Sequence, residues 1–304
     1  MDDRTIKRIK AFTPLEKISP EIEARDAGCF LTGFTLVELI VVVSIIGLLV
    51  AILLPALGAA RGRAKAVVCQ SNLKNLGVAF ACYAEDYDGF VMPTMATPVY
   101  WWGSKELDGI DHKKGFLWPY MRSELKEDSA YECSQQRFGS YGLQGKPAAE
   151  PDDKKWITST YGYNGYYLCP PHSGWEVDIG FRPWQKITTI KKPDEVFAFA
   201  DTLIDQDKTG RNPVLQNTAL LDPPFRYEPE NIGNPWLKNE YPTTCFRHSN
   251  KTNVVFVDGH CGAMDLQGGW FTSPAAKIGS VGKENTPHYV PDWKQWPIPE
   301  RRKK

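Results

Sequence analysis

Four side chains in the C-terminal part of the sequence are of types that bind metal ions: Asp201, His248, Asp258 and His260. A metal site needs three or more such ligands to converge. Asp258 and Gly259 stand between two apolar runs, and this predicts a two-residue β-hairpin turn because glycine accepts a positive φ. The hairpin would place Asp258 beside His260 at its tip and His248 just before its first strand. The alternative is a structural role, in which Asp258 forms the turn and His248 hydrogen-bonds to loop backbone.

Cysteine is the second reactive side chain that stands out. Six of the seven cysteines follow residue 33: Cys69, Cys82, Cys133, Cys169, Cys245 and Cys261. In an exported domain six cysteines permit up to three disulfides, and the alternative is a mixture of buried free thiols and one bridge. No two form a C-x-x-C pair, which argues against a zinc knuckle or a thioredoxin-type site. Cys69 and Cys82 cannot pair, because 13 residues on one predicted helix separate their Cα atoms by ~20 Å.

Motifs of common enzymes are missing from the sequence. There is no G-x-S-x-G, no glycine-rich phosphate loop and no H-E-x-x-H. Lys plus Arg equals Asp plus Glu, 36 against 36, so no net charge attracts nucleic acid. We therefore expect a protein that is not an enzyme and has no nucleic-acid partner.

The elements that would position these side chains follow from the apolar pattern. Residues 196–200 and 253–257 are short apolar runs with high β propensity. Residues 58–88 carry an apolar stripe at helical spacing, and Asp88-Gly89 should end that helix. We predict an α+β fold in which the helix packs on a small antiparallel sheet, with Gly/Pro-rich loops at 139–185 and 205–242.

A membrane-spanning helix is predicted at residues 34–57. No charged residue occurs between Leu39 and Leu54, and the segment exceeds the ~20 residues that a helix needs to cross a bilayer. A core helix of a soluble protein would show a polar face, which this segment lacks. Glu38 is the exception, and an acid at that depth is a functional hypothesis by default. The alternative is that Glu38 reaches water near the lipid headgroups.

The stretch GFTLVE at 33–38, followed by the apolar helix, resembles the cleavage motif of type IV prepilins and type II secretion pseudopilins. The resemblance implies that residues 1–33 are a cytoplasmic leader, which a prepilin peptidase removes by cutting after Gly33. It also implies N-methylation of Phe34. Glu38 would neutralise the N-terminal amine of a neighbouring subunit during assembly.

Further matches resemble a branch of large pilin-like proteins. They are CQSNLKNLG at 69–77, YAEDYDG at 83–89, and His248 followed after nine residues by Asp258-Gly259. In this reading residues 89–304 form the C-terminal globular domain. Cys133 lies in another matching patch, so the resemblance favours a Cys69–Cys133 disulfide. We expect no cofactor; the alternative that the resemblance implies is Ca²⁺, which major pseudopilins hold in a C-terminal loop.

The function that this resemblance implies is that of a structural subunit of a type IV pilus-like or type II secretion filament. Its partners would be the prepilin peptidase, other pilin or pseudopilin subunits and an inner-membrane assembly platform. It would cross the inner membrane once, with the C-terminal domain periplasmic or extracellular. The alternative is a membrane-anchored extracytoplasmic binding or hydrolytic domain that uses a prepilin-type export signal.

Overall fold

The computed structural model describes residues 34–96, 98–136, 139–142, 156–169, 184–207, 212–228, 231 and 233–295. The predicted leader therefore lies outside the described residues. The chain divides into two compact units, Met1–Ile52 and Leu53–Lys304, which we describe separately. Helix α1 (Leu36–Asp86) contributes to both units.

Helix α1 is continuous over 51 residues, so the two predicted segments at 34–57 and 58–88 belong to one helix. It continues through Pro55. Its end is close to the predicted one, because Asp88 and Gly89 both have positive φ values, 53° and 81°. The Gly89 amide donates to the Ala84 carbonyl at 2.8 Å, which satisfies one of the last carbonyls of the helix.

The part of α1 in the first unit is mostly apolar and exposed. Its side chains include Leu36 at 73% exposure and Ile52 at 69%. The helix is long and apolar enough to cross a membrane, and the apolar window that meets this criterion buries nothing within the protein. A single membrane span near the N-terminus is therefore consistent with the structure.

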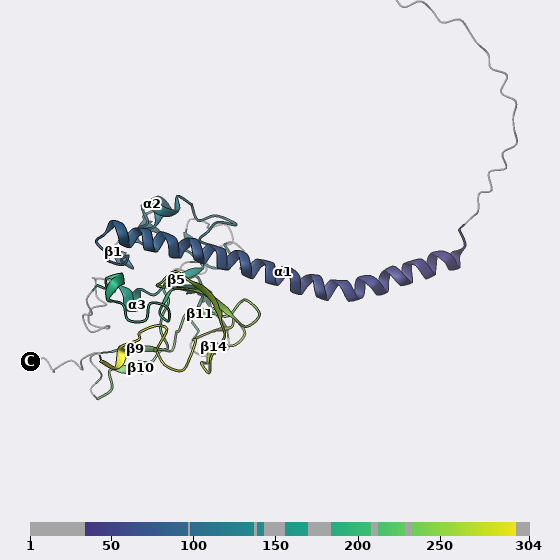
Figure 1. Ribbon diagram of the computed structural model, residues 1–304. Coiled ribbons are helices and arrows are strands. Elements are labelled where there is room, and N and C mark those ends of the chain that lie inside the picture. The colour runs from purple at the N-terminus through teal and green to yellow at the C-terminus, as the bar shows by residue number, and fades with distance from the viewer. Residues whose placement is uncertain are drawn as a thin grey trace, which may run out of the picture. The chain divides into compact units, whose positions relative to one another are not determined.

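A four-stranded antiparallel sheet lies at the centre of the second unit and packs on α1 (Figure 1). Its strand order is β13 (Cys261–Met264), β12 (Thr252–Phe256), β6 (Phe197–Asp201), β5 (Tyr161–Tyr163). The two predicted strands correspond to β6 and β12, which pair with each other. The predicted α+β class, a long helix on a small antiparallel sheet, is confirmed.

The hairpin between β12 and β13 forms where the Asp-Gly pair predicts it, but its loop is longer. The Phe256 amide donates to the His260 carbonyl at 2.9 Å, so Val257, Asp258 and Gly259 lie in the loop. Gly259 has φ +87°, the conformation that a three-residue hairpin loop requires. The prediction of a two-residue turn was wrong because it counted Val257 as a strand residue. The Val257 amide instead donates to the Val196 carbonyl next to β6.

Further short elements surround this sheet. The 139–185 and 205–242 segments are not simple loops, because they contain α3 and β5 and the strands β7 to β10, each strand two or three residues long. The remaining elements are β1 (Met95–Ala96), β2 (Val99–Tyr100), β3 (Gly103–Glu106), β4 (Gly109–Asp111), η1 (His112–Lys114), α2 (Trp118–Met121), α3 (Gly165–Leu168), η3 (Ile187–Thr189), β7 (Ile204–Asp205), β8 (Leu215–Gln216), β9 (Phe225–Tyr227), β10 (Trp236–Lys238), β11 (Thr244–Cys245), β14 (Phe271–Ser273), β15 (Ile278–Gly279) and η4 (Trp293–Gln295).

Aromatic rings form much of the core between α1 and the sheet. Phe199 on β6 is fully buried, and its ring centroid lies 6.1 Å from Phe80 on α1 and 5.2 Å from Trp101. Trp101 donates its indole N–H to the Ala219 carbonyl at 2.8 Å, so its polar atom is paired although the residue is buried.

Gly77 is the residue of α1 that allows the closest approach of the sheet. A Cβ at this position would lie 2.7 Å from Cγ2 of Val255 on β12. Gly77→Ala is therefore expected to lower the free energy of unfolding by ~1–3 kcal/mol, the usual cost of overpacking a core. Thermal unfolding of the full chain in detergent measures the change.

Gly62→Ala is the matched control on the same helix. Its Cβ would meet Nε2 of Gln135 at 3.9 Å, an ordinary contact. Because alanine is the better helix former, this variant should gain up to ~1 kcal/mol. Equal shifts in the melting temperature for the two variants would contradict the tight helix–sheet contact.

Candidate functional site

The N-terminal motif residues lie at the start of α1. Phe34 is 73% exposed, whereas Gly33 lies outside the described residues. Glu38 accepts hydrogen bonds at Oε2 from the Thr35 amide at 2.8 Å and the Thr35 hydroxyl at 2.7 Å. The Glu38 amide in turn donates to Thr35 Oγ1 at 3.2 Å. This reciprocal pair of hydrogen bonds is a capping box at the start of α1. The sequence analysis missed this role of Glu38, although a threonine followed three residues later by a glutamate is the signal for a capping box.

The four C-terminal candidates do not form one site. Asp258 and His260 lie at the tip of the β12–β13 hairpin, whereas His248 and Asp201 meet at the other end of β12. The five residues of β12, at ~3.3 Å each, separate the two pairs. Of the two interpretations that the sequence left open, a metal site that joins His248 to the hairpin tip does not form, because β12 runs away from His248.

At the hairpin tip, Asp258 has the structural role that was one of the two interpretations of the sequence. Its Oδ1 accepts the His260 amide at 3.0 Å and contacts His260 Nδ1 at 2.7 Å. The His260 ring stacks on Phe256 with centroids 4.0 Å apart. Lys74 of α1 donates its ammonium to the Gly259 carbonyl at 2.7 Å, which fixes the loop on the helix. These contacts account for both side chains without a ligand.

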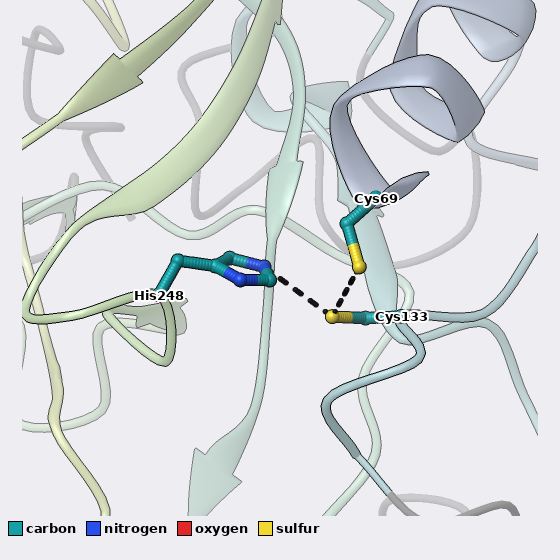
Figure 2. Close-up of side chains that lie close together, drawn as sticks. All are labelled: Cys69, Cys133 and His248. Atoms are coloured by element: carbon teal, nitrogen blue, oxygen red, sulfur yellow. Dashed lines mark hydrogen bonds between the residues drawn. The ribbon is translucent and has the colours of Figure 1, made fainter. Parts of the chain in front are cut away.

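A second group of reactive side chains is buried under α1 (Figure 2). Sγ of Cys69 lies 2.8 Å from Sγ of Cys133, and that sulfur lies 3.3 Å from Nε2 of His248. Both cysteines are 0% exposed and His248 is 4% exposed. Cys69 comes from α1, Cys133 from the segment after Tyr131, and His248 from the turn before β12. In the part of the chain that the structure describes, these three are the one group of His, Cys, Asp or Glu whose ligand atoms converge as a metal site requires.

Local hydrogen bonds fix the segment that carries Cys133 against α1 and β5. Asn72, one turn after Cys69 on α1, donates its amide to the Glu132 carbonyl at 3.0 Å. The Tyr161 hydroxyl donates to the same carbonyl at 3.2 Å. The Cys133 amide donates to the Thr160 hydroxyl at 2.6 Å. These hydrogen bonds fix the peptide between Glu132 and Cys133 against α1 and β5.

Asp201, at the end of β6, completes the group. Its Oδ2 lies 3.2 Å from Nε2 of His248 and accepts the Asn253 amide at 2.8 Å. Its Oδ1 is buried and has no hydrogen-bond partner among the described residues. Arg247 is the nearby cation, and it donates to Gln136 Oε1 at 2.7 Å and to the Thr202 carbonyl. Of the sequence candidates, the structure thus brings His248 and Asp201 together.

The pKa values of the two cysteines and of His248 are shifted in different directions. The hydrogen bond with Cys133, strengthened by His248, lowers the pKa of the Cys69 thiol, and burial opposes this effect. Burial and the hydrogen bond with Cys69 raise the pKa of Cys133 well above its ordinary value. Burial lowers the pKa of His248, but hydrogen bonds with Asp201 and Cys69 outweigh it and raise the value to about 9. The shifts thus act towards a negative charge on Cys69 and a positive charge on His248.

The predicted Cys69–Cys133 disulfide concerns the same two sulfurs. The structure brings them together but holds both as free thiols, and their 2.8 Å separation exceeds the ~2.05 Å of a disulfide bond. The disulfide therefore stays a prediction. Helix α1 contains both Cys69 and Cys82, as the argument against their pairing assumed.

The chemistry open to this group follows from its burial and its atom types. Two thiols, an imidazole and a carboxylate can bind a thiophilic metal, and two adjacent thiols can form a disulfide. Ca²⁺ prefers oxygen ligands, so this set does not suit it. A substrate could reach neither sulfur, because both are fully buried. Short-range spacing in the sequence does not reveal this group, because Cys133 is 64 residues from Cys69 and 115 residues from His248.

Fold and site together define an α+β protein with an apolar N-terminal helix and a buried Cys-Cys-His cluster that contacts an Asp. No protein-family model matches the chain, and no curated protein or solved structure matches it either. Its function is therefore argued from its own residues and from the resemblance of its N-terminal motif.

Proposed function

We propose that this protein is a pilin-like or pseudopilin structural subunit that a prepilin peptidase processes and that assembles into a type II secretion or type IV pilus-like filament. The observation that carries the proposal is that one helix, α1, has two different surroundings. In the first unit its side chains are apolar and exposed, whereas in the second unit residues such as Cys69, Leu73 and Phe80 are buried in the core.

The exposed half of α1 needs an apolar environment. Leaving so many large aliphatic side chains in water would cost ~25 cal/mol for each Å² of apolar surface. A bilayer meets this need before assembly, and the equivalent helices of neighbouring subunits meet it in a filament. A subunit that moves from one environment to the other keeps its apolar surface covered throughout.

The charged start of the helix supports the same proposal. Glu38 is one turn into α1, with its carboxylate held by Thr35. Removal of the leader after Gly33 would create a new ammonium group on Phe34. A negative side chain close to the membrane-embedded end of one subunit can then pair with the ammonium of another, which gives a reason for an acid where the rest of the segment is apolar.

The processing step is directly testable. The mature chain in the membrane fraction is expected to begin at Phe34 with a methylated amine, as measured by N-terminal mass spectrometry. Gly33→Leu should block cleavage because the peptidase is expected to need a small residue before the cut. Gly33→Ala is the matched control and should be processed. A leader left intact on the wild-type chain, or a cut after the apolar run, would contradict the prepilin interpretation.

A further inference from the structure

We propose that Cys69, Cys133 and His248 form a buried site for one zinc ion, which ties α1 to the central sheet, with Asp201 beside the imidazole as the fourth ligand. Zinc is bound in proteins by thiolate sulfur, imidazole nitrogen and carboxylate oxygen, and structural sites have four ligands in a tetrahedron. The four side chains supply two sulfurs, one nitrogen and one oxygen. The proposal is independent of the pilin-like function, because it concerns the interior of the second unit.

The positions of three of the ligand atoms are close to those that zinc requires, because the sulfurs of Cys69 and Cys133 and a ring nitrogen of His248 all lie within 4.8 Å of one another. Asp201 is outside that group, and its carboxylate, which contacts the imidazole, must move towards the sulfurs to become the fourth ligand. Zinc bonds of about 2.3 Å to sulfur and about 2.0 Å to nitrogen or oxygen place neighbouring ligand atoms about 3.3–3.8 Å apart. Nε2 of His248 lies 3.3 Å from Sγ of Cys133 and 3.2 Å from Oδ2 of Asp201. The two sulfurs, 2.8 Å apart, must separate by about 1 Å to admit the ion.

Charge balance is a second argument. Asp201 is fully buried, and one of its oxygens has no partner among the described residues. Buried charges are normally paired or bound to a metal. A zinc ion would balance the two thiolates that it binds and would lie close to the buried carboxylate.

Two of the four side chains, Asp201 and Cys133, have hydrogen bonds of the kind expected around metal ligands. The Asn253 amide holds Oδ2 of Asp201, and the Thr160 hydroxyl accepts the amide of Cys133. Such second contacts orient the ligands before the ion arrives. Nδ1 of His248 has no partner among the described residues, so the imidazole lacks the second hydrogen bond that usually orients a metal-binding histidine.

Zinc and the disulfide are mutually exclusive at these sulfurs. A disulfide would use Cys69 and Cys133 and would leave no role for the imidazole that converges on them or for the carboxylate that contacts it. Zinc uses all four side chains. The convergence of His248 on the thiol pair, with Asp201 beside the imidazole, is therefore the observation that favours the metal.

The test uses the full chain, purified in detergent without chelator. Elemental analysis by mass spectrometry should find one zinc per chain, and chelation should lower the melting temperature, which zinc restores. Co²⁺ added to the chelated chain should give the intense d–d and thiolate-to-metal absorption of tetrahedral sulfur coordination. These wild-type measurements need no variant to fold.

Variants then assign the ligands. Cys133→Ser should lower zinc affinity by at least ~100-fold in competition with a chromophoric chelator. Cys82→Ser is the matched control, because Cys82 is an exposed cysteine on the same helix, and its affinity should stay unchanged. A metal-free reduced chain that gives no cobalt spectrum would overturn the proposal. Peptide mapping that recovers a Cys69–Cys133 disulfide from the membrane fraction would overturn it too, with processing at Phe34 unaffected.

Discussion

Glutamine in place of Glu38 is expected to abolish filament assembly while membrane insertion and leader cleavage stay intact. Glutamine can replace glutamate in a capping box, so the start of α1 keeps its hydrogen bonds with Thr35. What the substitution removes is the charge. In the proposed assembly it would leave the ammonium of a neighbouring subunit without its partner in a low-dielectric environment. Breaking a buried ion pair in this way costs about 3–5 kcal/mol, which is at least ~100-fold in association.

The measurement is sedimentation of filaments from cells that express the two proteins at equal levels, with crosslinking as a second assay. Thr35→Ala is the matched control, because it removes the hydroxyl side of the capping box but keeps the charge of Glu38. It should cost ~1 kcal/mol of helix stability and leave filaments present. Filaments of normal yield from Glu38→Gln would mean that the protein is an anchored extracytoplasmic domain and not a polymerising subunit.

Phe199→Ala is expected to cause the largest loss of stability in the second unit, ~3–5 kcal/mol. The ring is fully buried and is in contact distance of aromatic rings from three other segments, Phe80, Trp101 and Tyr163. Truncation would leave a cavity where α1 meets the sheet, and these neighbours cannot all move to fill it. Urea denaturation monitored by near-UV circular dichroism measures the effect.

Leu107→Ala is the control for that experiment. Leu107 is fully exposed in the turn between β3 and β4, so its truncation should change the free energy of unfolding by less than ~0.5 kcal/mol. Similar unfolding midpoints for the two variants would show that the aromatic cluster is not part of a shared core.

Much of the fold could be predicted because its main elements carry local signals. An uninterrupted apolar run predicts the first half of α1, Asp88-Gly89 predicts its end, and Asp258-Gly259 predicts the position of the hairpin. In each case the signal and the element lie within the same few residues. The exact loop length was wrong because it depends on a backbone contact of Val257 with a distant segment.

The remaining strands could not be predicted, for physical reasons. Strands of two or three residues are too short for an alternating pattern. The loop prediction was also wrong at Gly162, which lies in β5. A Cβ at this position would come within 2.7 Å of the backbone of Leu220. There glycine allows two segments to approach closely, which is a property of packing and not of a turn.

The candidate site was predicted in parts but not as a whole. His248 and Asp201 were recognised by residue type, and Cys69 and Cys133 through the family resemblance. Their assembly depends on how α1, β6 and the turn before β12 pack, which no local spacing encodes. Asp258 and His260 were candidates because of the predicted hairpin, but their side-chain contacts lie within that hairpin.

The core that unites α1 with the last part of the chain has a consequence for biosynthesis. Ala84 and Tyr289, roughly 200 residues apart, both belong to the buried interior. At ribosomal rates of 5–20 residues per second the helix would therefore wait about 10–40 s for residues it needs to complete its packing. Contacts so distant in sequence also slow folding itself. During that interval the future inner face of α1 stays uncovered, so newly made chains should be clients of a holding chaperone until their last residues emerge.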